Sequence, residues 1–397
     1  MANKNVAIAG TINETIKEEN MTVNGFKFIG VGAAGNKAVL FLVDTGLVTK
    51  ESVLLINSTK KDVPEDYSGA YLGLSNNGCG KERSVAKEYA VQTMKSGALE
   101  QYIDKAVDSV IIICSVGGGT GSGASPIIGE YCNKVLGKHT HFIVFTGFEE
   151  DARELQNSVD FFNELNFDCD VQCIKNSLFL QASLGNKFRA EKLANVELAE
   201  KIQVMLGVDM IASEQNIDDT DMYKIINTTG YKTCERFEVT ENLVDIESFN
   251  KICKQMIYNS KSLKSNEPGQ IRMGVILNLA PESEDAVDFG FSVLKDAYGV
   301  PYECFIHKQW NGKTQFISFI CSGMKLPIDE IKEIHNNYLE LTSKVDKEND
   351  SFFQELDKLD KGEADKNKFD MVHRGKGGKN TTTSADFFKQ FETKPSK

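Results

Sequence analysis

The sequence lacks the segments that place a protein in or across a membrane. No run of residues approaches the roughly 18 apolar positions that a helix needs to cross a bilayer. The apolar patch nearest the start, Val6–Ala9, is too short for the apolar part of a signal peptide. We therefore expect the protein to stay in the cytoplasm where it is made.

Its cysteines also lack the spacing of a disulfide framework or a zinc site. Most of the nine lie in apolar runs, such as the one ending at Cys114. The closest pair, Cys169 and Cys173, has no second pair and no histidine at ligand spacing. Buried free thiols in a reducing compartment explain this usage best.

A third absence is the GxxxxGK[ST] motif, which excludes an ordinary P-loop NTPase. In its place the chain has two glycine-rich turns. The first, GVGAAG, covers Gly30–Gly35, and the second, GGGTGSG, covers Gly117–Gly123. Each follows a predicted strand, at Phe26–Val31 and Val110–Cys114, and each precedes a predicted helix.

The second turn has the composition of a phosphate-binding loop. Glycines let backbone N–H groups approach an oxyanion without a Cβ in the way, and the following helix adds a favourable dipole. Thr120 and Ser122 can add hydroxyl donors. The alternative, a merely flexible turn, needs one or two glycines, whereas this segment has five in seven positions.

The first turn alone matches the GxGxxG of a Rossmann fold, so a Rossmann-type NAD(P)-dependent oxidoreductase is one alternative. The end of the next strand, Ile56–Thr59, offers no acidic residue for a ribose diol. A Rossmann enzyme also has no use for a second phosphate loop. Two such loops converging on one ligand suit a nucleoside triphosphate.

Strands and helices alternate up to residue 174, which predicts an α/β fold with a mostly parallel sheet. We expect helices from about Asn36, over Glu82–Ser96, Pro126–Val135 and Arg153–Leu165, and a loop over Tyr71–Gly80. Later expectations are strands at Arg272–Leu279, Tyr302–Ile306 and Gln315–Cys321, and a helix at Ser283–Tyr298. The predicted units are an N-terminal helical extension (1–21), a nucleotide-binding domain (22–185), a long central helix (186–212), a smaller α+β second domain (213–325), a long C-terminal helix (326–361) and a flexible basic tail (362–397).

The GGGTGSG segment at Gly117–Gly123 resembles the signature of the tubulin/FtsZ superfamily, and the likeness extends from about Phe26 to Gly323. The resemblance implies a GTPase that binds GTP or GDP with Mg²⁺, for which no protein ligand can be named. Carried over by position, the nucleotide contacts are Gly30, Gly32, Ala33, Ala34, Gly35, Asn36, Asn57, Gly73, Gly117, Gly118, Gly119, Thr120, Gly121, Ser122, Glu149, Arg153, Asn176 and Asn195. Asn195 would form hydrogen bonds with guanine. The alternative interpretation is that Asn195 is a solvated residue on a helix surface.

The same resemblance gives a role to an acidic segment after the central helix. Asn216, Asp218 and Asp221 match the Asn-x-Asp-x-x-Asp by which the family completes the nucleotide site of the next subunit. The resemblance implies that these residues are catalytic and orient the attacking water. Hydrolysis would then follow head-to-tail assembly into filaments. Without the resemblance, this would be an acidic loop in solvent.

Charge sets the end of the chain apart. Residues 366–397 carry eight Lys/Arg against three Asp/Glu; because the whole chain carries −12, the first 365 residues carry −17. A basic tail after a long helix resembles the TubZ proteins of plasmid and phage DNA partition, in which the tail contacts a small DNA-binding adaptor, TubR, on a centromere-like site in the bacterial cytoplasm. The alternatives are a cell-division ring protein like FtsZ, and a solvated tail that keeps filaments apart.

Overall fold

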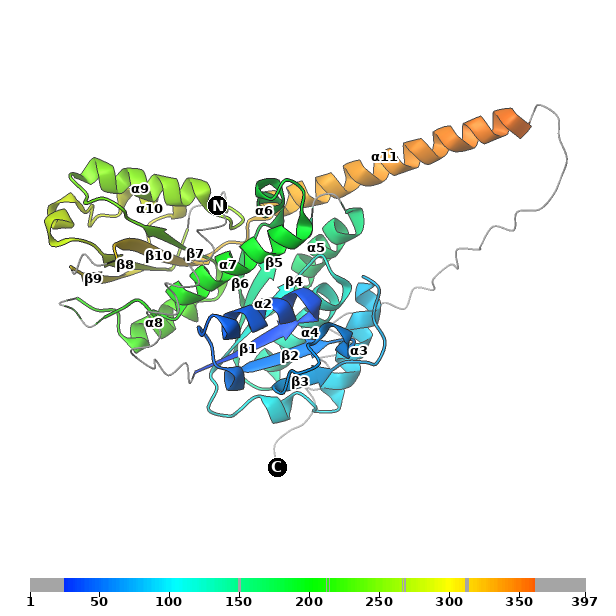
Figure 1. The fold of residues 1–397 in the computed structure, drawn as a ribbon, viewed down its shortest axis with the longest axis horizontal. Helices are drawn as coiled ribbons and strands as arrows, with labels where there is room; N and C mark the ends of the chain where they lie inside the picture. Colours follow the sequence, from blue (N-terminus) through cyan, green and yellow to red (C-terminus); the bar gives the residue numbers. More distant parts are fainter. Residues whose placement is uncertain are drawn as a thin grey trace.

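The computed structural model describes residues 25–360 except 149–150, 212, 214, 266, 268 and 311–313. The expected N-terminal helical extension and the basic tail lie outside the described residues. Within them, ten strands form one sheet in the order β3-β2-β1-β4-β5-β6-β7-β10-β8-β9. Helices cover both faces of this sheet, as Figure 1 shows.

The first part of the sheet is all parallel, as the sequence predicts. Its continuous β-branched and aromatic runs are buried on both faces, as expected of a parallel sheet between helices. The strands are β1 (Phe26–Val31), β2 (Val53–Asn57), β3 (Ala70–Gly73), β4 (Ser109–Ser115), β5 (His139–Phe145) and β6 (Asp170–Ile174). Strand β3 corrects the expectation of a loop beginning at Tyr71: its four residues pair with β2 at the sheet edge before the loop starts.

Helices α2 (Gly32–Asp44), α6 (Asn176–Ala182), α7 (Lys187–Met205) and α8 (Asp219–Ile226) contribute to one apolar core. Helices α3 (Arg83–Lys95), α4 (Gly119–Lys134) and α5 (Ala152–Glu164) contribute to the other. Both glycine turns start their helices earlier than expected, because α2 begins at Gly32 and α4 at Gly119. Pro126 is therefore inside α4, in a helix whose burial outweighs the poor helix propensity of its glycines.

The second part of the sheet is mixed. Strand β10 (Phe316–Met324) is antiparallel to both β7 (Gly230–Glu238) and β8 (Arg272–Asn278), and β8 is parallel to β9 (Glu303–Gln309). The prediction of a single helix over Ser283–Tyr298 is wrong. The structure instead has a 3₁₀ segment, η4 (Pro281–Ala286), and a helix, α10 (Ser292–Tyr298), separated at Phe291, whose φ of 49° cannot continue a helix. Helix α9 (Ile246–Asn259) and strand β7 were not foreseen.

The two parts of the sheet meet along a narrow seam. Strands β6 and β7 pair through Asp170 with Gly230 and Val171 with Tyr231, whereas β5 and β6 pair over five positions. Helix α7 spans the seam in Figure 1 and contacts both β6 and β7.

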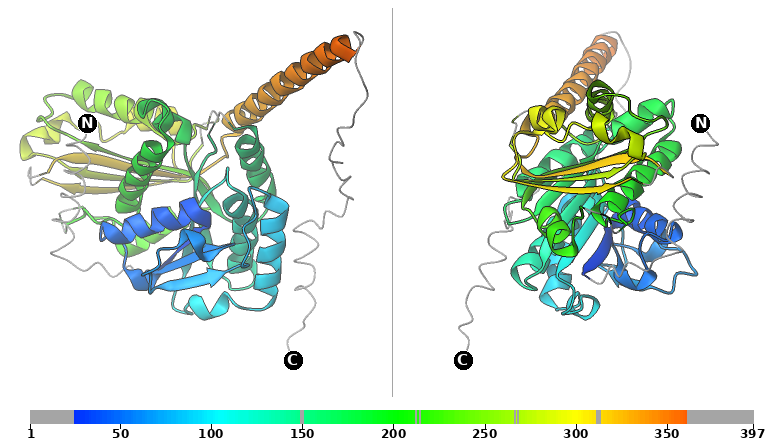
Figure 2. Two further views of the ribbon diagram at one scale, coloured as in Figure 1. Left: turned by 45° about the vertical axis from the view of Figure 1, so that its right-hand side comes forward. Right: turned by 90° about the vertical axis from the view of Figure 1, so that its left-hand side faces the viewer.

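The expected long C-terminal helix is α11 (Ile328–Asp360). Its first turns pack against the body, with Ile331 and Ile334 buried and the helix in contact with α5. Beyond them it points away from the body in both views of Figure 2.

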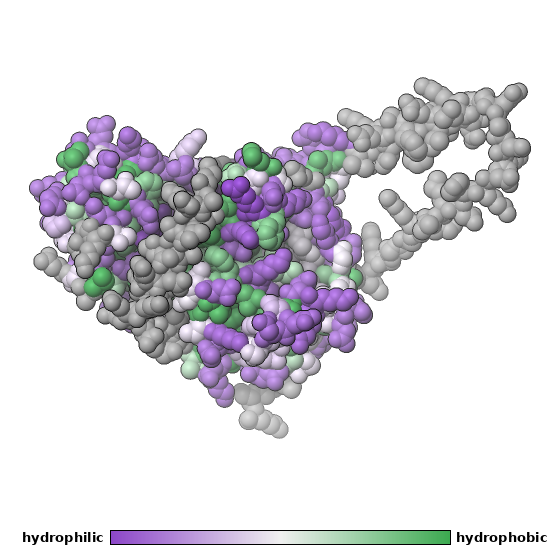
Figure 3. All heavy atoms as spheres, viewed as in Figure 1, coloured by the Kyte–Doolittle hydropathy of each residue, from purple (hydrophilic) through white to green (hydrophobic). Residues whose placement is uncertain are grey.

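The surface shown in Figure 3 is mostly hydrophilic, with hydrophobic side chains gathered near its middle. No helix in the described part of the chain is long and apolar enough to cross a membrane.

Candidate nucleotide site

The main pocket opens where the order of the parallel strands reverses. Strands β2 and β3 follow on one side of β1, and β4 to β6 on the other. At such a point the connecting helices diverge to opposite faces and leave a crevice at the carboxyl ends of the strands. The pocket has a volume of about 360 Å³, within the usual range for small-molecule sites. Residues at or just after the ends of five strands line it: Val31, Asn57, Ser115, Phe145 and Asn176.

The two glycine turns meet in this crevice. A Cβ on Gly32, whose φ is +78°, would lie 3.1 Å from the backbone nitrogen of Gly121. A Cβ on Gly121 would lie 2.3 Å from the carbonyl oxygen of Ser115. Nothing lies within 4 Å of a Cβ at Gly118, so this position faces open space. Close backbone approach explains the glycines that the sequence placed here.

Both turns present helix N-termini that protein side chains leave uncapped. Helix α2 begins after Val31 and helix α4 after Gly118, and neither has a side-chain cap or an acidic residue in its first turn. By contrast, Asp151 caps α5 and Asp245 caps α9. The first N–H groups of a helix need a partner, and the dipole there favours an anion. Two uncapped N-termini in one pocket fit the phosphates of a nucleotide.

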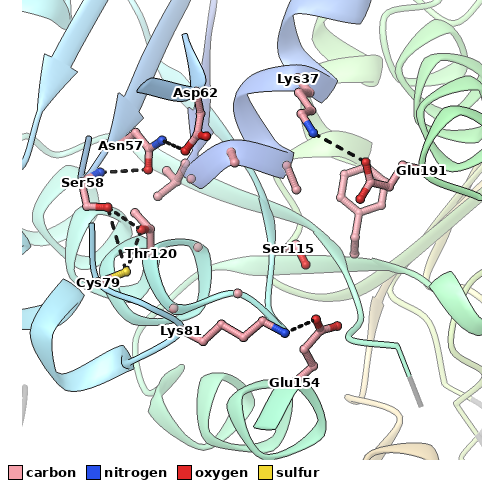
Figure 4. Close-up of a pocket in the computed structure, with 18 of the residues that line it drawn as sticks. Lys37, Asn57, Ser58, Asp62, Cys79, Lys81, Ser115, Thr120, Glu154 and Glu191 are labelled. Carbon is pink, nitrogen blue, oxygen red and sulfur yellow. Dashed lines mark hydrogen bonds and ion pairs between the residues drawn. The ribbon is translucent and has the colours of Figure 1, made fainter. Parts of the chain in front are cut away.

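Polar side chains complete the pocket wall beside the second turn. Thr120 Oγ1 lies 2.9 Å from Ser58 Oγ and 3.0 Å from Cys79 Sγ. Asn57 Oδ1 accepts from the Ser58 backbone nitrogen at 2.9 Å, and Asn57 Nδ2 donates to Asp62 at 2.9 Å. Figure 4 shows this group on one side of the pocket. These hydroxyl and carboxylate oxygens are the donor type that Mg²⁺ prefers, and could hold its hydration shell.

The opposite wall comes from helix α7. Glu191, Ala194 and Asn195 line the pocket, and Lys37 of α2 lies 3.7 Å from Glu191. Asn195 is half-buried and faces the pocket, whereas Asn176 donates its side-chain amide to the Thr146 carbonyl at 2.8 Å.

The structure brings ten of the expected nucleotide residues into the pocket wall: Gly32, Ala33, Ala34, Asn57, Gly118, Gly119, Thr120, Gly121, Asn176 and Asn195. Glu149 lies outside the described residues. The other seven are not among the residues that line the pocket: Gly30, Gly35, Asn36, Gly73, Gly117, Ser122 and Arg153.

Several of these outer residues support the wall instead of forming it. Gly35 packs on β4, where a Cβ would lie 2.2 Å from the Ile113 carbonyl oxygen, and Ser122 donates its hydroxyl to the Gly118 carbonyl. Arg153 forms an ion pair with Glu82. Asn36 is fully buried, and neither of its amide atoms has a hydrogen-bond partner among the described residues.

The acidic segment lies away from this pocket. It follows the carboxyl end of α7, whose amino-terminal half lines the pocket; the ten residue steps from Asn195 to Met205 correspond to about 15 Å of helix. The segment is also less of a loop than expected, because Asp219 and Asp221 lie in the first turn of α8. Asp218 caps that helix by accepting from the Asp221 backbone nitrogen at 2.8 Å, and Asn216 bonds to the backbone of Ser213.

A second polar cluster lies near the amino-terminal ends of β5 and β6, beside the β6–β7 seam. Asp170 Oδ1 accepts from Lys232 Nζ at 3.0 Å, and Oδ2 lies 2.5 Å from His141 Nδ1 and 3.1 Å from His139 Nε2. Two histidines and a carboxylate can hold a metal, but the Lys232 ammonium already compensates this carboxylate. Burial lowers the pKa of His141 to about 4, and Lys232 adds to the effect. Burial alone would raise the pKa of Asp170, but His141 and Lys232 lower it below its usual value.

Comparison with known proteins identifies the first part of the chain. Residues 26–182 match the model described as the GTPase domain of the Tubulin/FtsZ family. Over these residues the chain is similar to that domain, which argues against the Rossmann alternative.

Relatives extend the likeness beyond this domain. The tubulin-like protein TubZ of a Clostridium botulinum C phage is 27% identical over 230 residues, which are 55% of this chain and 62% of that protein. The match thus covers less than two thirds of that relative. Tail-truncated TubZ of C. botulinum phage c-st has a similar fold, with a TM-score of 0.65 and 20% identity over 81% of this chain and 99% of that one. A GTPγS-form protofilament of TubZ from Bacillus thuringiensis serovar israelensis gives a TM-score of 0.64 and 16% identity over 86% and 98%.

Four pocket residues that lie between the two glycine turns in the sequence were not predicted. Ser58, Asp62, Cys79 and Lys81 all line the pocket, and none belongs to a recognisable motif. The one available signal was the Gly/Asn-rich loop ending at Gly80, which precedes Lys81 directly.

Proposed function

We propose that this protein hydrolyses GTP at the contact between two copies and thereby forms dynamic head-to-tail filaments. The observation that carries the proposal is the pair of uncapped helix N-termini, α2 and α4, meeting in one pocket of a tubulin/FtsZ GTPase domain. Mg²⁺ would bind the β- and γ-phosphates there and offset their charge.

The separation of the acidic segment from the pocket supports hydrolysis between copies. Asp218 and Asp221 follow the far end of α7, so they are poorly placed to act on the nucleotide bound by their own chain. A second copy stacked end to end would bring them to the phosphates, where their carboxylates would orient and polarise the attacking water. Such a head-to-tail contact repeats without closing and builds a filament, the assembly named for the B. thuringiensis relative.

The sharpest test separates the charge of Asp218 from its role as a helix cap. Asp218→Asn keeps a good N-cap but loses the carboxylate, whereas Asp218→Ala loses both. We expect phosphate release from GTP to fall roughly 100-fold in both variants, the scale for losing a positioned polar catalyst. GDP binding by the monomer should stay unchanged.

Asp219→Asn is the matched control, because Asp219 lies in the same turn and outside the matched motif. It should retain most of the activity. If Asp218→Asn hydrolyses GTP at the wild-type rate, the water-positioning role is wrong. If the wild-type protein neither assembles with GTP nor releases phosphate at any concentration, the whole proposal fails.

We further propose that the filaments move plasmid or phage DNA through a small DNA-binding adaptor of the TubR kind. The likeness to phage TubZ and the charge of +5 on residues 366–397 support this reading over a cell-division ring. The body, at −17, is poorly suited to bind DNA directly.

Deletion of residues 366–397 tests the adaptor proposal. GTP hydrolysis and filament sedimentation should stay near wild type, while co-sedimentation of an adaptor–DNA complex is lost. A variant that replaces the eight Lys/Arg of this tail by Gln, at unchanged length, separates charge from mere length. Undiminished recruitment by both variants would contradict a role for the tail.

A further inference from the structure

Lys81 occupies an unusual position beside the phosphate-binding turn. It ends the loop between β3 and α3, and its backbone lies against Gly119: a Cβ there would be 2.6 Å from the Lys81 carbonyl carbon and 2.8 Å from the Glu82 nitrogen. Asn157 Nδ2 donates to the carbonyls of both Lys81, at 3.2 Å, and Gly117, at 2.8 Å. The backbone of Lys81 is thus fixed to the turn that holds the phosphates.

The backbone conformation of Lys81 is also strained. Its φ is 65°, a left-handed value that only two other non-glycine residues adopt in the described part of the chain. A left-handed conformation is unfavourable for a residue that has a Cβ. Such strain persists where the surrounding structure holds it, and it is concentrated at binding and catalytic sites.

The side chain is held by exchangeable partners. Lys81 Nζ donates to Asp151 Oδ2 at 2.6 Å and to Glu154 Oε1 at 2.8 Å, both in the N-terminal region of α5. Figure 4 shows Lys81 and Glu154 pointing toward each other below the pocket. The Lys81 side chain is 46% exposed, and ion pairs this accessible contribute little net stability. A doubly charged phosphate could therefore displace them.

The charges of the pocket assign Lys81 to the terminal phosphate. Its described lining contains two cationic residues, Lys37 and Lys81. Lys37 pairs with Glu191, on the wall that also carries Asn195, whereas Lys81 adjoins the glycine turn. With the base at Asn195 and the phosphates at the turn, the third phosphate lies on the side of Lys81. The carboxylate of Glu154 also lines the pocket and would repel that phosphate if Lys81 were absent.

We propose that Lys81 distinguishes GTP from GDP by binding the γ-phosphate. Its ammonium leaves Asp151 and Glu154 when GTP is bound and stays with them when GDP is bound. This inference rests on the proposed nucleotide site. Charge-assisted bonds to the γ-phosphate replace those to two carboxylates, so that the exchange favours GTP over GDP. Since Asp151 caps α5, the exchange would also change the charge at the start of that helix.

Equilibrium binding of GDP and of the non-hydrolysable analogue GMPPCP to the full-length protein, below the concentration for assembly, tests the proposal. Lys81→Met should weaken GMPPCP binding at least 10-fold and GDP binding less than 2-fold. Lys81→Arg should restore most of the preference. Lys37→Met is the matched control and should affect both nucleotides alike.

The opposite change provides an independent test. Asp151→Asn combined with Glu154→Gln keeps the helix cap but removes the charges that hold Lys81. This double variant should bind GMPPCP several-fold more tightly relative to GDP than the wild type does. Equal effects on both nucleotides in the Lys81→Met and double variants would overturn the assignment. A wild-type protein that binds neither nucleotide would instead overturn the proposed function.

Discussion

Single residues differ in how much their sequence context tells about the pocket. Glycines were informative because backbone contact leaves no room for a Cβ, and this requirement is local: Gly32, Gly119 and Gly121 all line the pocket. Lys81 was not predictable, because its meaning comes from partners 70 and 73 residues away, Asp151 and Glu154. A lysine after a glycine looks the same in any surface loop.

At the same scale, the buried His141 should make the stability of the protein depend on pH. Its pKa is lowered to about 4, from about 6.5 in the unfolded chain, so the unfolded state binds more protons between these values. The stability it contributes is present above pH 6.5 and is lost as pH falls toward 4. Between pH 7 and pH 5 we expect a loss of about 2 kcal/mol from this group.

Urea unfolding at several pH values measures this loss. His141→Gln should unfold with a shallower pH dependence, smaller by about the contribution of one such group. His335→Gln, at an exposed position on α11, is the control and should keep the wild-type slope. Identical slopes in the wild type and His141→Gln would show that His141 does not titrate in this way.

The sequence predicted the type of each helix or strand more reliably than its first and last residues. The parallel strands carry a continuous apolar signal that depends on burial by both helix layers, and β1 and β4 lie where expected. The starts of α2 and α4 were missed, because their glycines are poor helix formers and only tertiary packing makes them helical. The break at Phe291 was invisible for the same reason: its left-handed conformation is imposed by context.

The start of α4 leads to a prediction about this element. In Gly121→Ala the new Cβ would lie 2.3 Å from the Ser115 carbonyl oxygen, so the helix or β4 must shift. We expect the free energy of unfolding without nucleotide to fall by about 1–3 kcal/mol, and GDP affinity to fall with it. Urea denaturation and nucleotide titration give the two quantities.

Gly118→Ala is the matched substitution in the same turn. A Cβ there has no protein atom within 4 Å, and the φ of −77° suits alanine. Its stability without nucleotide should lie within about 0.5 kcal/mol of the wild type. Equal destabilisation by both substitutions would mean that the turn does not require close contact at Gly121.

On the scale of the whole molecule, the two ends differ in chemistry. One end presents a pocket whose helix N-termini favour anions, and the other presents the acidic turn of α8. The sequence predicted the glycine-turn pocket and the acidic segment separately. Only the folded chain shows how far apart they lie along α7. This polarity is why the proposed contact between copies is directional.

The narrow seam between β6 and β7 has a mechanical consequence. Two paired positions join the parallel part of the sheet to the mixed part, and the buried bond between Asp170 and Lys232 lies across this join. A sheet bends most easily where two neighbouring strands share the fewest paired positions. If neighbours in a polymer press on the two ends of a subunit, the sheet should bend first between β6 and β7, where the Asp170–Lys232 ion pair and helix α7 resist the bending.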